Sequence, residues 1–235
     1  MKEETLMNNP ASNWPEHAAA RNTHNRMFEI VQRHLGGLND ISILDMPCGA
    51  GLFSSRLAQA GMQVTAMDIE AVEPFKFDPA HRMLADANLG LPFDAEKFDA
   101  LVSIEGIEHL DNPRGFLREC ARVVKPGGYV FVSTPNVDSF RSRKYVMLRG
   151  YHHYFGPRGD SSKDSGHMLP VDMIFFRGAA KLAGLEIVEI NVNEMAGKTW
   201  FKEWLRPMLS RNLPLNMRGE IPFYGDVILY ALRKA

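Results

Sequence analysis

Short apolar runs alternate with amphipathic segments along most of the chain. Brief apolar or β-branched runs predict buried strands, and apolar residues that recur every three to four positions predict helices. The expected strands cover 41–46, 64–69, 83–87, 98–105, 129–134, 185–192 and 226–232. The expected helices cover 16–35, 52–60, 113–124 and 171–182, with a short one at 141–148. Several of these helices are followed by glycine, as at Gly36, Gly61 and Gly184, which favours helix termination.

Strands that alternate with helices of this length predict parallel pairing through right-handed crossovers, hence an α/β sandwich. The chain of 235 residues, 1–235, is expected to form a single domain. Three stretches fall outside the alternation: an N-terminal leader at 1–15, an insertion at 136–168 rich in Arg, Tyr, His, Gly and Ser, and a second insertion at 195–224. We expect the insertion at 136–168 to be a lid that contacts the substrate.

Charge and composition exclude some classes of function. The chain has 27 basic and 28 acidic residues, whereas nucleic-acid binders usually cluster excess Lys and Arg, so we expect no nucleic-acid partner. Two cysteines without metal-ligand spacing give no disulfide framework. The N-terminus lacks the pattern of a secretion signal, and no stretch approaches the roughly 18 apolar residues of a membrane span. We therefore expect a cytoplasmic protein.

The strongest motif is a glycine-containing loop at 43–53, where the first strand passes into the next helix. Gly49 and Gly51 allow the backbone to turn sharply and to approach a ligand. Asp68 follows about 20 residues later, where an acid can accept hydrogen bonds from ribose hydroxyls. The third glycine of the dinucleotide fingerprint is absent, and Asp45 would repel a pyrophosphate but could face a cationic sulfonium. Alternatively, Asp45 only caps or orients the loop.

Three further motifs occur in order at 85–93, 98–105 and 124–130, which read Ala-Asp-Ala-Asn-Leu-Gly-Leu-Pro-Phe, Phe-Asp-Ala-Leu-Val-Ser-Ile-Glu and Val-Lys-Pro-Gly-Gly-Tyr-Val. Together with the loop, they resemble the class I methyltransferases that use S-adenosyl-L-methionine (SAM), in particular the branch of ubiquinone-biosynthesis O-methyltransferases and polysaccharide-pathway methyltransferases. The resemblance implies a Rossmann-like three-layer sandwich with a seven-stranded, mostly parallel sheet whose last strand is antiparallel. Pro47 and Cys48 depart from the Gly-Cys that many relatives have in the loop.

The resemblance also implies SAM as cofactor and S-adenosyl-L-homocysteine (SAH) as product. The loop glycines would pass the methionyl part of SAM, and the acid after the second strand would hold the ribose. The pair Asp86-Ala87 matches the family position that contacts the adenine edge, and the fourth strand lies beside the methionyl group. The predicted cofactor-binding residues are Asp45, Gly49, Gly51, Asp68, Ile69, Asp86, Ala87 and Glu105.

Methyl transfer from a sulfonium requires alignment of acceptor, methyl and sulfur, and removal of the acceptor's proton. Glu105, Glu108 and His109 follow the fourth strand, and His167 ends the first insertion. Glu108, His109 and His167 are the catalytic candidates, and all four residues are candidate ligands of a divalent metal. This resembles the Glu-x-x-Glu-His arrangement of ubiquinone-pathway O-methyltransferases and small-RNA terminal 2′-O-methyltransferases. Without a metal, Glu105 would contact SAM and His109 would be a general base or a structural histidine.

These observations predict O-methylation of a hydroxyl on a small or medium-sized molecule. The alternatives are N-methylation, methylation of an RNA terminal 2′-hydroxyl and a non-catalytic SAM-binding regulator. An NAD-dependent oxidoreductase is a further alternative, which a test of cofactor binding distinguishes. The aromatic residues at 145–155 could hold an acceptor ring or pack within the lid. The Trp-containing stretch at 199–211 suits a peripheral membrane contact, a homodimer contact or core packing.

Overall fold

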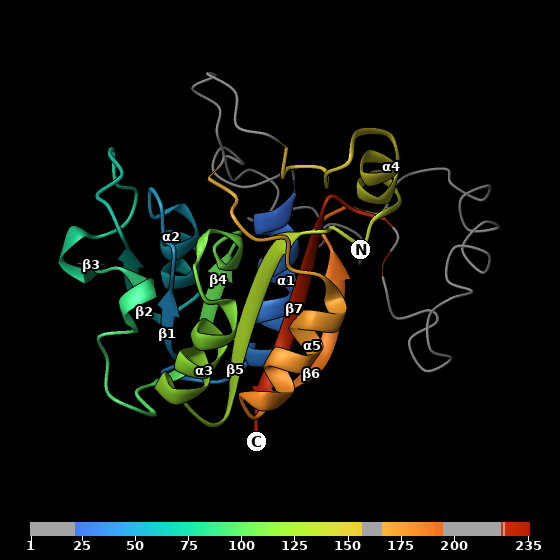
Figure 1. Ribbon diagram of the computed structural model, residues 1–235. Helices are drawn as coiled ribbons and strands as arrows, with labels where there is room; N and C mark the ends of the chain where they lie inside the picture. Colours follow the sequence, from blue (N-terminus) through green and yellow to red (C-terminus); the bar gives the residue numbers. More distant parts are fainter. Residues whose placement is uncertain (1–21, 157–165, 195–221, 223) are drawn as a thin grey trace, which may run out of the picture.

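A computed structural model gives the arrangement of most of the chain (Figure 1). It describes residues 22–156, 166–194, 222 and 224–235. The leader at 1–15, nearly all of the insertion at 195–224 and the whole stretch at 199–211 lie outside the described residues. What the sequence predicts for those stretches therefore stays a prediction.

A single seven-stranded sheet forms the centre of the molecule, with the strand order β3-β2-β1-β4-β5-β7-β6. Its strands are β1 (Ser42–Asp45), β2 (Gln63–Asp68), β3 (Arg82–Leu84), β4 (Phe98–Ile104), β5 (Val124–Pro135), β6 (Leu185–Val192) and β7 (Val227–Lys234). β7 pairs antiparallel with both β5 and β6, and all pairs among β1 to β5 are parallel. The predicted fold class is confirmed.

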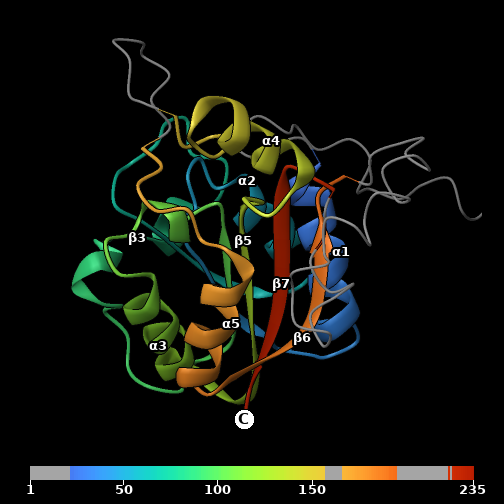
Figure 2. The ribbon, with the colours of Figure 1, turned by 45° about the vertical axis from the view of Figure 1, so that its right-hand side comes forward.

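Helices cover both faces of the sheet (Figures 1 and 2). The helices are α1 (Thr23–Leu35), α2 (Leu52–Gln59), α3 (Pro113–Val123), α4 (Phe140–Arg149) and α5 (Met173–Leu182). Short 3-10 turns are η2 (Pro79–His81), η3 (Ala87–Leu89) and η4 (Ile107–His109). α3 and α5 pack on one face and α1 and α2 on the other, while α4 lies beyond the carboxyl ends of the strands. Among the described residues, no helix has the length and apolar character needed to cross a membrane.

The central strands are buried on both faces. In β1 the neighbouring side chains of Ile43 and Leu44 point to opposite faces, so Leu44 packs with residues of α3 and α5, and Ile43 with residues of α1 and α2. Both side chains are fully buried. Parallel strands between two helical layers need apolar residues at nearly every position. This requirement explains why the sequence shows continuous apolar runs there.

The observed boundaries differ from the expected ones at β3 and β5. β3 ends at Leu84 because the chain turns into η3, where the Asp86 side chain accepts a hydrogen bond from the Asn88 N–H at 2.9 Å. β5 begins at Val124 rather than at 129, since Val124 already pairs with Phe98 ahead of an irregularity in the register. The short helix expected in the first insertion is confirmed as α4.

The stacked pair of Phe176 and Tyr230 provides a test of the core beneath α5. Their ring centroids are 3.9 Å apart, and both side chains are fully buried. We expect Phe176→Ala to lower the free energy of unfolding by about 3–5 kcal/mol, because it leaves a cavity. The control Phe175→Ala removes a neighbouring ring that is 38% exposed and should cost much less. Urea unfolding followed by circular dichroism measures both variants, and equal losses would contradict this packing.

Candidate active site

The carboxyl ends of the parallel strands bring several functional side chains to one edge of the sheet. β1 lies between β2 and β4, so the strand order reverses at this point. In open α/β sheets, ligands bind in the crevice outside the carboxyl ends of the strands at such a reversal. Asp45 ends β1, Asp68 ends β2, and Glu105 directly follows β4. These three carboxylates line one cleft.

Asp68 fixes the glycine loop that follows β1. Its carboxylate accepts hydrogen bonds from the N–H groups of Gly49 at 2.7 Å and of Ile69 at 2.8 Å. Gly49 has a φ of 50°, in the left-handed region that favours glycine. The bond from Gly49 therefore holds the loop against the end of β2. Because an ionised carboxylate has about four acceptor positions, Asp68 can still accept hydrogen bonds from a ribose.

The two loop glycines have different surroundings. A Cβ atom at Gly49 would meet nothing within 4 Å, so the backbone there borders open space. At Gly51 the φ is 76°, and a Cβ atom would lie 2.7 Å from the ring of Phe75. The expectation that both glycines allow close approach to a ligand is therefore supported for Gly49 only. Gly51 is required by the turn into α2 and by the packing of Phe75.

The position of Asp45 is compatible with both roles that the sequence left open. Its side chain is 1% exposed and accepts a hydrogen bond from the Ser54 hydroxyl, which joins the end of β1 to α2. Asp45 also lines the cleft beside the loop. Burial raises the pKa of Asp45 to about 7, and the nearby carboxylate of Asp68 adds to this rise. A cationic ligand in the cleft would favour the ionised form of Asp45.

The larger of two adjoining clefts has a volume of about 410 Å³ and suits the adenosine part of the cofactor. It contains five of the predicted cofactor residues. They are Asp68, Ile69, Asp86, Ala87 and Glu105. The Ile69 side chain is 64% exposed and so offers an apolar surface to a bound ring.

The smaller cleft has a volume of about 140 Å³ and shares Pro47, Asp68 and Glu105 with the larger one. Asp45 and the loop lie along it, as the predicted methionyl site requires. It also contains His24, which comes from α1. His24 is not among the site residues expected from the sequence, because the pattern of α1 predicts only a helix that packs on the sheet.

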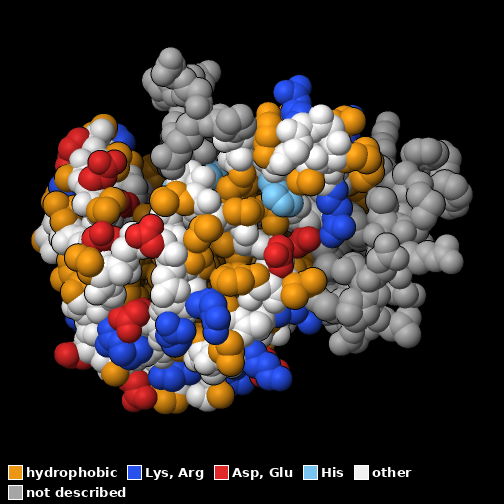
Figure 3. All heavy atoms as spheres, viewed as in Figure 1, with side chains coloured by type: hydrophobic (Ala, Val, Ile, Leu, Met, Phe, Trp, Pro, Cys, Tyr) orange, Lys and Arg blue, Asp and Glu red, His pale blue; other side chains and the backbone are white. Residues whose placement is uncertain are grey.

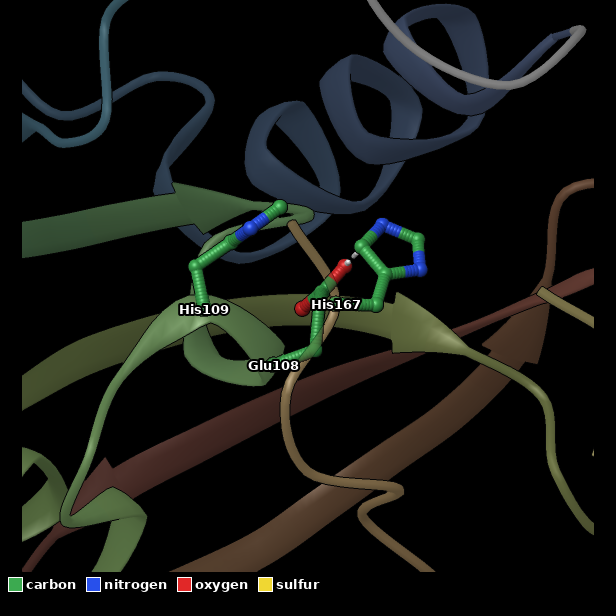
Figure 4. A group of neighbouring side chains, drawn as sticks. All are labelled: Glu108, His109 and His167. Atoms are coloured by element: carbon green, nitrogen blue, oxygen red, sulfur yellow. Dashed lines mark ion pairs between the residues drawn. The ribbon is translucent and has the colours of Figure 1, made fainter. Parts of the chain in front are cut away.

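An acid and two imidazoles meet beside the larger cleft (Figure 4). Glu108, His109 and His167 offer ligand atoms that all lie within 4.8 Å of one another. Nε2 of His167 lies 4.0 Å from Oε1 of Glu108, and the rings of His109 and His167 are 4.8 Å apart between centroids. His109 also lines the larger cleft. We refer to these three residues as the acid–imidazole cluster.

Backbone hydrogen bonds bring His167 to this place from far along the chain. The N–H groups of Met168 and Leu169 donate to the carbonyl oxygen of Glu108 at 3.0 and 3.2 Å. Gly166 lies against the His109 ring, since a Cβ atom there would be 3.3 Å from Nδ1 of His109. The end of the first insertion is thereby fixed to η4.

Glu105 does not join the cluster. Its N–H donates to the Ser133 hydroxyl at 3.0 Å, its φ is 49°, and its side chain lines both clefts. The structure therefore brings together three of the four predicted metal ligands. The position of Glu105 agrees better with its predicted role beside the cofactor.

Glu108 is an unusual buried acid. Its side chain is 0% exposed, and neither carboxylate oxygen has a hydrogen bond of good geometry within the part of the chain that the structure describes. Burial raises the pKa of Glu108 to about 8, and the charge of Glu105 adds to this rise. A buried, unsatisfied carboxylate is costly unless it binds a proton or a cation. Two nitrogens and one oxygen from this cluster fit a divalent transition metal better than Ca²⁺.

Aromatic side chains of the first insertion surround His167. The rings of Phe155 and Tyr154 lie 5.3 and 6.4 Å from it, and His153 lies 4.0 Å from Tyr154. On the face shown in Figure 3, histidine side chains reach the surface below α4, next to hydrophobic groups and close to charged ones. Aromatic rings thus border His167 on the side of the first insertion.

Comparison with known proteins identifies the family of the chain. A family model described as a methyltransferase domain matches residues 19–190, more than half of the chain. The chain belongs to this family. It is a SAM-dependent methyltransferase of the class I, Rossmann-like type. The cofactor that the sequence predicted is therefore the one that the family uses.

The methyltransferase is also similar to individual curated proteins and solved structures. It is 33% identical over 208 residues to the ubiquinone biosynthesis O-methyltransferase of Cronobacter sakazakii, covering 84% of this chain and 82% of the relative. A match to the protein of the same name from Serratia proteamaculans is 34% identical over 120 residues and spans about half of each chain, 47% and 49%. A SAM-dependent methyltransferase structure from Archaeoglobus fulgidus has a TM-score of 0.57 at 18% identity, covering 90% and 92% of the chains. At this identity the structural likeness shows the fold alone.

Replacing Glu108 tests whether its burial costs stability. The carboxyl of Glu108 has a pKa of about 8 in the folded chain against an ordinary value of 4.5, so between these values unfolding releases a proton. The folded state therefore loses stability as the pH rises through this range. We expect Glu108→Gln to raise the melting temperature of the chelator-treated protein more at pH 8 than at pH 5, by about 2–4 °C for each kcal/mol gained.

Differential scanning fluorimetry in EDTA at the two pH values measures this effect. Glu186→Gln, at an exposed position of β6, is the matched control and should give the same small shift at both. A Glu108→Gln variant that melts lower than the parent protein at pH 8 would show that the carboxylate is satisfied after all.

Proposed function

We propose that the methyltransferase transfers the methyl group of SAM to a hydroxyl oxygen of a small acceptor that carries two neighbouring oxygen atoms. The acid–imidazole cluster is the observation that carries this proposal. It combines a buried carboxylate without hydrogen bonds among the described residues with two imidazoles, and His109 belongs both to the cluster and to the wall of the larger cleft. An acceptor bound at the cluster would therefore lie next to the cofactor.

The cluster suits a divalent metal held by Glu108, His109 and His167. Such an ion would orient hydroxyl oxygens and lower their pKa. Two imidazoles and one carboxylate favour Mn²⁺, Fe²⁺, Co²⁺ or Zn²⁺ at least as well as Mg²⁺. The buried position of Glu108 supports the assignment, because a cation is the partner that makes an ionised carboxylate favourable there.

The residues of the chain would divide the remaining tasks. Asp68 would hold the ribose while it keeps the loop in place. Asp45 and Glu105 put negative charge beside the smaller cleft, which favours the sulfonium and the ammonium of SAM. With the metal bound, the lowered pKa of the acceptor hydroxyl would ease the loss of its proton. Without the metal, an imidazole of the cluster would accept that proton, because a neutral imidazole then has a free ring nitrogen. Alignment by these groups accounts for catalysis, because the sulfonium is already a good leaving group.

The names of the relatives support oxygen as the acceptor atom. The curated proteins from Cronobacter sakazakii and Serratia proteamaculans are both named as O-methyltransferases of ubiquinone biosynthesis. Identities of 33% and 34% do not extend that support to a particular substrate. A small catechol is therefore the probe we choose, because it presents two neighbouring hydroxyls; 3,4-dihydroxybenzoate adds only a ring carboxylate.

Replacement of His167 by alanine tests the cluster directly. We expect His167→Ala to weaken Mn²⁺ binding at least tenfold and to lower methyl transfer to 3,4-dihydroxybenzoate at least a hundredfold, because a candidate metal ligand is lost. SAH binding should stay within about threefold, since His167 lies outside both clefts. Calorimetric titration with Mn²⁺ and SAH and a SAH-release assay measure the three quantities.

The control is His81→Ala, which removes an exposed imidazole on η2 away from the cluster. It should leave Mn²⁺ binding and methyl transfer unchanged. Full activity in His167→Ala would contradict the catalytic assignment of His167. An unchanged Mn²⁺ affinity would contradict its assignment as a metal ligand.

A further inference from the structure

The smaller cleft has acidic groups at the ends of strands and a histidine from a helix. Asp45 and Glu105 come from the ends of β1 and β4, and His24 comes from the first turn of α1. The ring nitrogens of His24 have no hydrogen bond among the described residues, although the side chain is partly buried. Its ring also lies 5.4 Å from that of Phe53 between centroids, which restricts its orientation.

A buried cation lies behind His24. Arg56, on α2, is 3% exposed, and its guanidinium lies 4.0 Å from the centre of the Phe28 ring. One of its nitrogens donates to the Asn25 side chain at 2.8 Å, whereas Nε and Nη2 have no hydrogen bond within the described residues. Arg56 is close enough to His24 to disfavour a second positive charge there. The charge of Arg56 therefore adds a positive contribution at this end of the cleft.

The amino-acid end of SAM is a zwitterion, and its two charges need different partners. The acids beside the cleft suit the ammonium, while the carboxylate needs donors. Three N–H groups of the loop are already used: Cys48 donates to the carbonyl of Met67, Gly51 donates to the carbonyl of Cys48, and Gly49 donates to Asp68. The imidazole N–H of His24 is a donor at the cleft that makes no hydrogen bond within the described chain.

We propose that His24 donates a hydrogen bond to the carboxylate of the methionyl part of SAM, and that Arg56 is a positioning residue whose charge favours this carboxylate. The inference rests on SAM as the cofactor and adds the group that selects its amino-acid end. Desolvation by burial lowers the pKa of His24 to about 4. The ring is therefore neutral at pH 7, where it has one N–H donor, and the positive charge comes from Arg56.

A ligand without the carboxylate tests this directly. SAH and its decarboxylated analogue, 5′-deoxy-5′-(3-aminopropylthio)adenosine, differ only in that group. The wild-type protein should bind SAH at least tenfold more tightly than the analogue in calorimetric titrations. His24→Ala should weaken SAH binding about tenfold and leave the analogue within about twofold, because a hydrogen bond to a charged group is lost. His24→Asn, which keeps a donor, should restore part of the difference.

Two further variants separate this role from packing. His34→Ala removes an imidazole at the other end of α1 that pairs with Glu189 and should leave the ratio of the two affinities unchanged. Arg56→Met should lower the ratio and Arg56→Lys should keep most of it, because only the second retains the charge. Circular dichroism shows whether each variant folds.

The outcomes are distinct. The proposal would be overturned if His24→Ala lost the same affinity for both ligands or lost none. Either result would show that the His24 side chain does not bind the carboxylate. If the wild-type protein bound neither ligand, the cofactor assignment itself would fail together with this inference.

Discussion

The parallel pairing of β1 with both of its neighbours is the constraint on which the site depends. Asp45 is in register with Ala66 of β2 and Val102 of β4, so the three strands end at the same edge of the sheet. Because the chain leaves β1 toward β2 and returns on the other side through β4, the crevice between these connections stays open. The acids at the ends of these strands therefore converge although they lie far apart in the sequence, and the loop between β1 and α2 forms part of the wall of the smaller cleft.

The acid–imidazole cluster depends on a second connection, this time through the backbone. The carbonyl of Glu108 receives N–H donors from Met168 and Leu169, which fixes His167 beside an acid that lies far from it along the chain. The aromatic residues Tyr154 and Phe155 then pack around the same imidazole. The first insertion thus contributes a candidate catalytic imidazole together with the aromatic side chains that pack around it.

The sequence predicted the sheet and its strand types, because hydrophobic period and strand ends are local properties of the chain. Seven of the eight residues that it predicts for the cofactor line the two clefts. It did not predict His24, since nothing local distinguishes an imidazole on a packing helix from one that borders a ligand cleft. The close approach of Phe75 to Gly51 could not be predicted from the sequence either, because the two residues belong to different loops. Glu105 was grouped with Glu108 by spacing, yet its backbone turn beside Ser133 directs it to the clefts. Long-range packing decided each of these cases.

Two buried acids at this edge have pKa values raised in the same way. Desolvation raises the pKa of Asp45 to about 7 and that of Glu108 to about 8, so each is costly to ionise while its surroundings lack a cation. Asp45 lines the cleft proposed for the sulfonium end of SAM, and Glu108 belongs to the proposed metal cluster. A cation that binds beside either acid relieves this cost, so part of the binding free energy appears as stability of the folded chain.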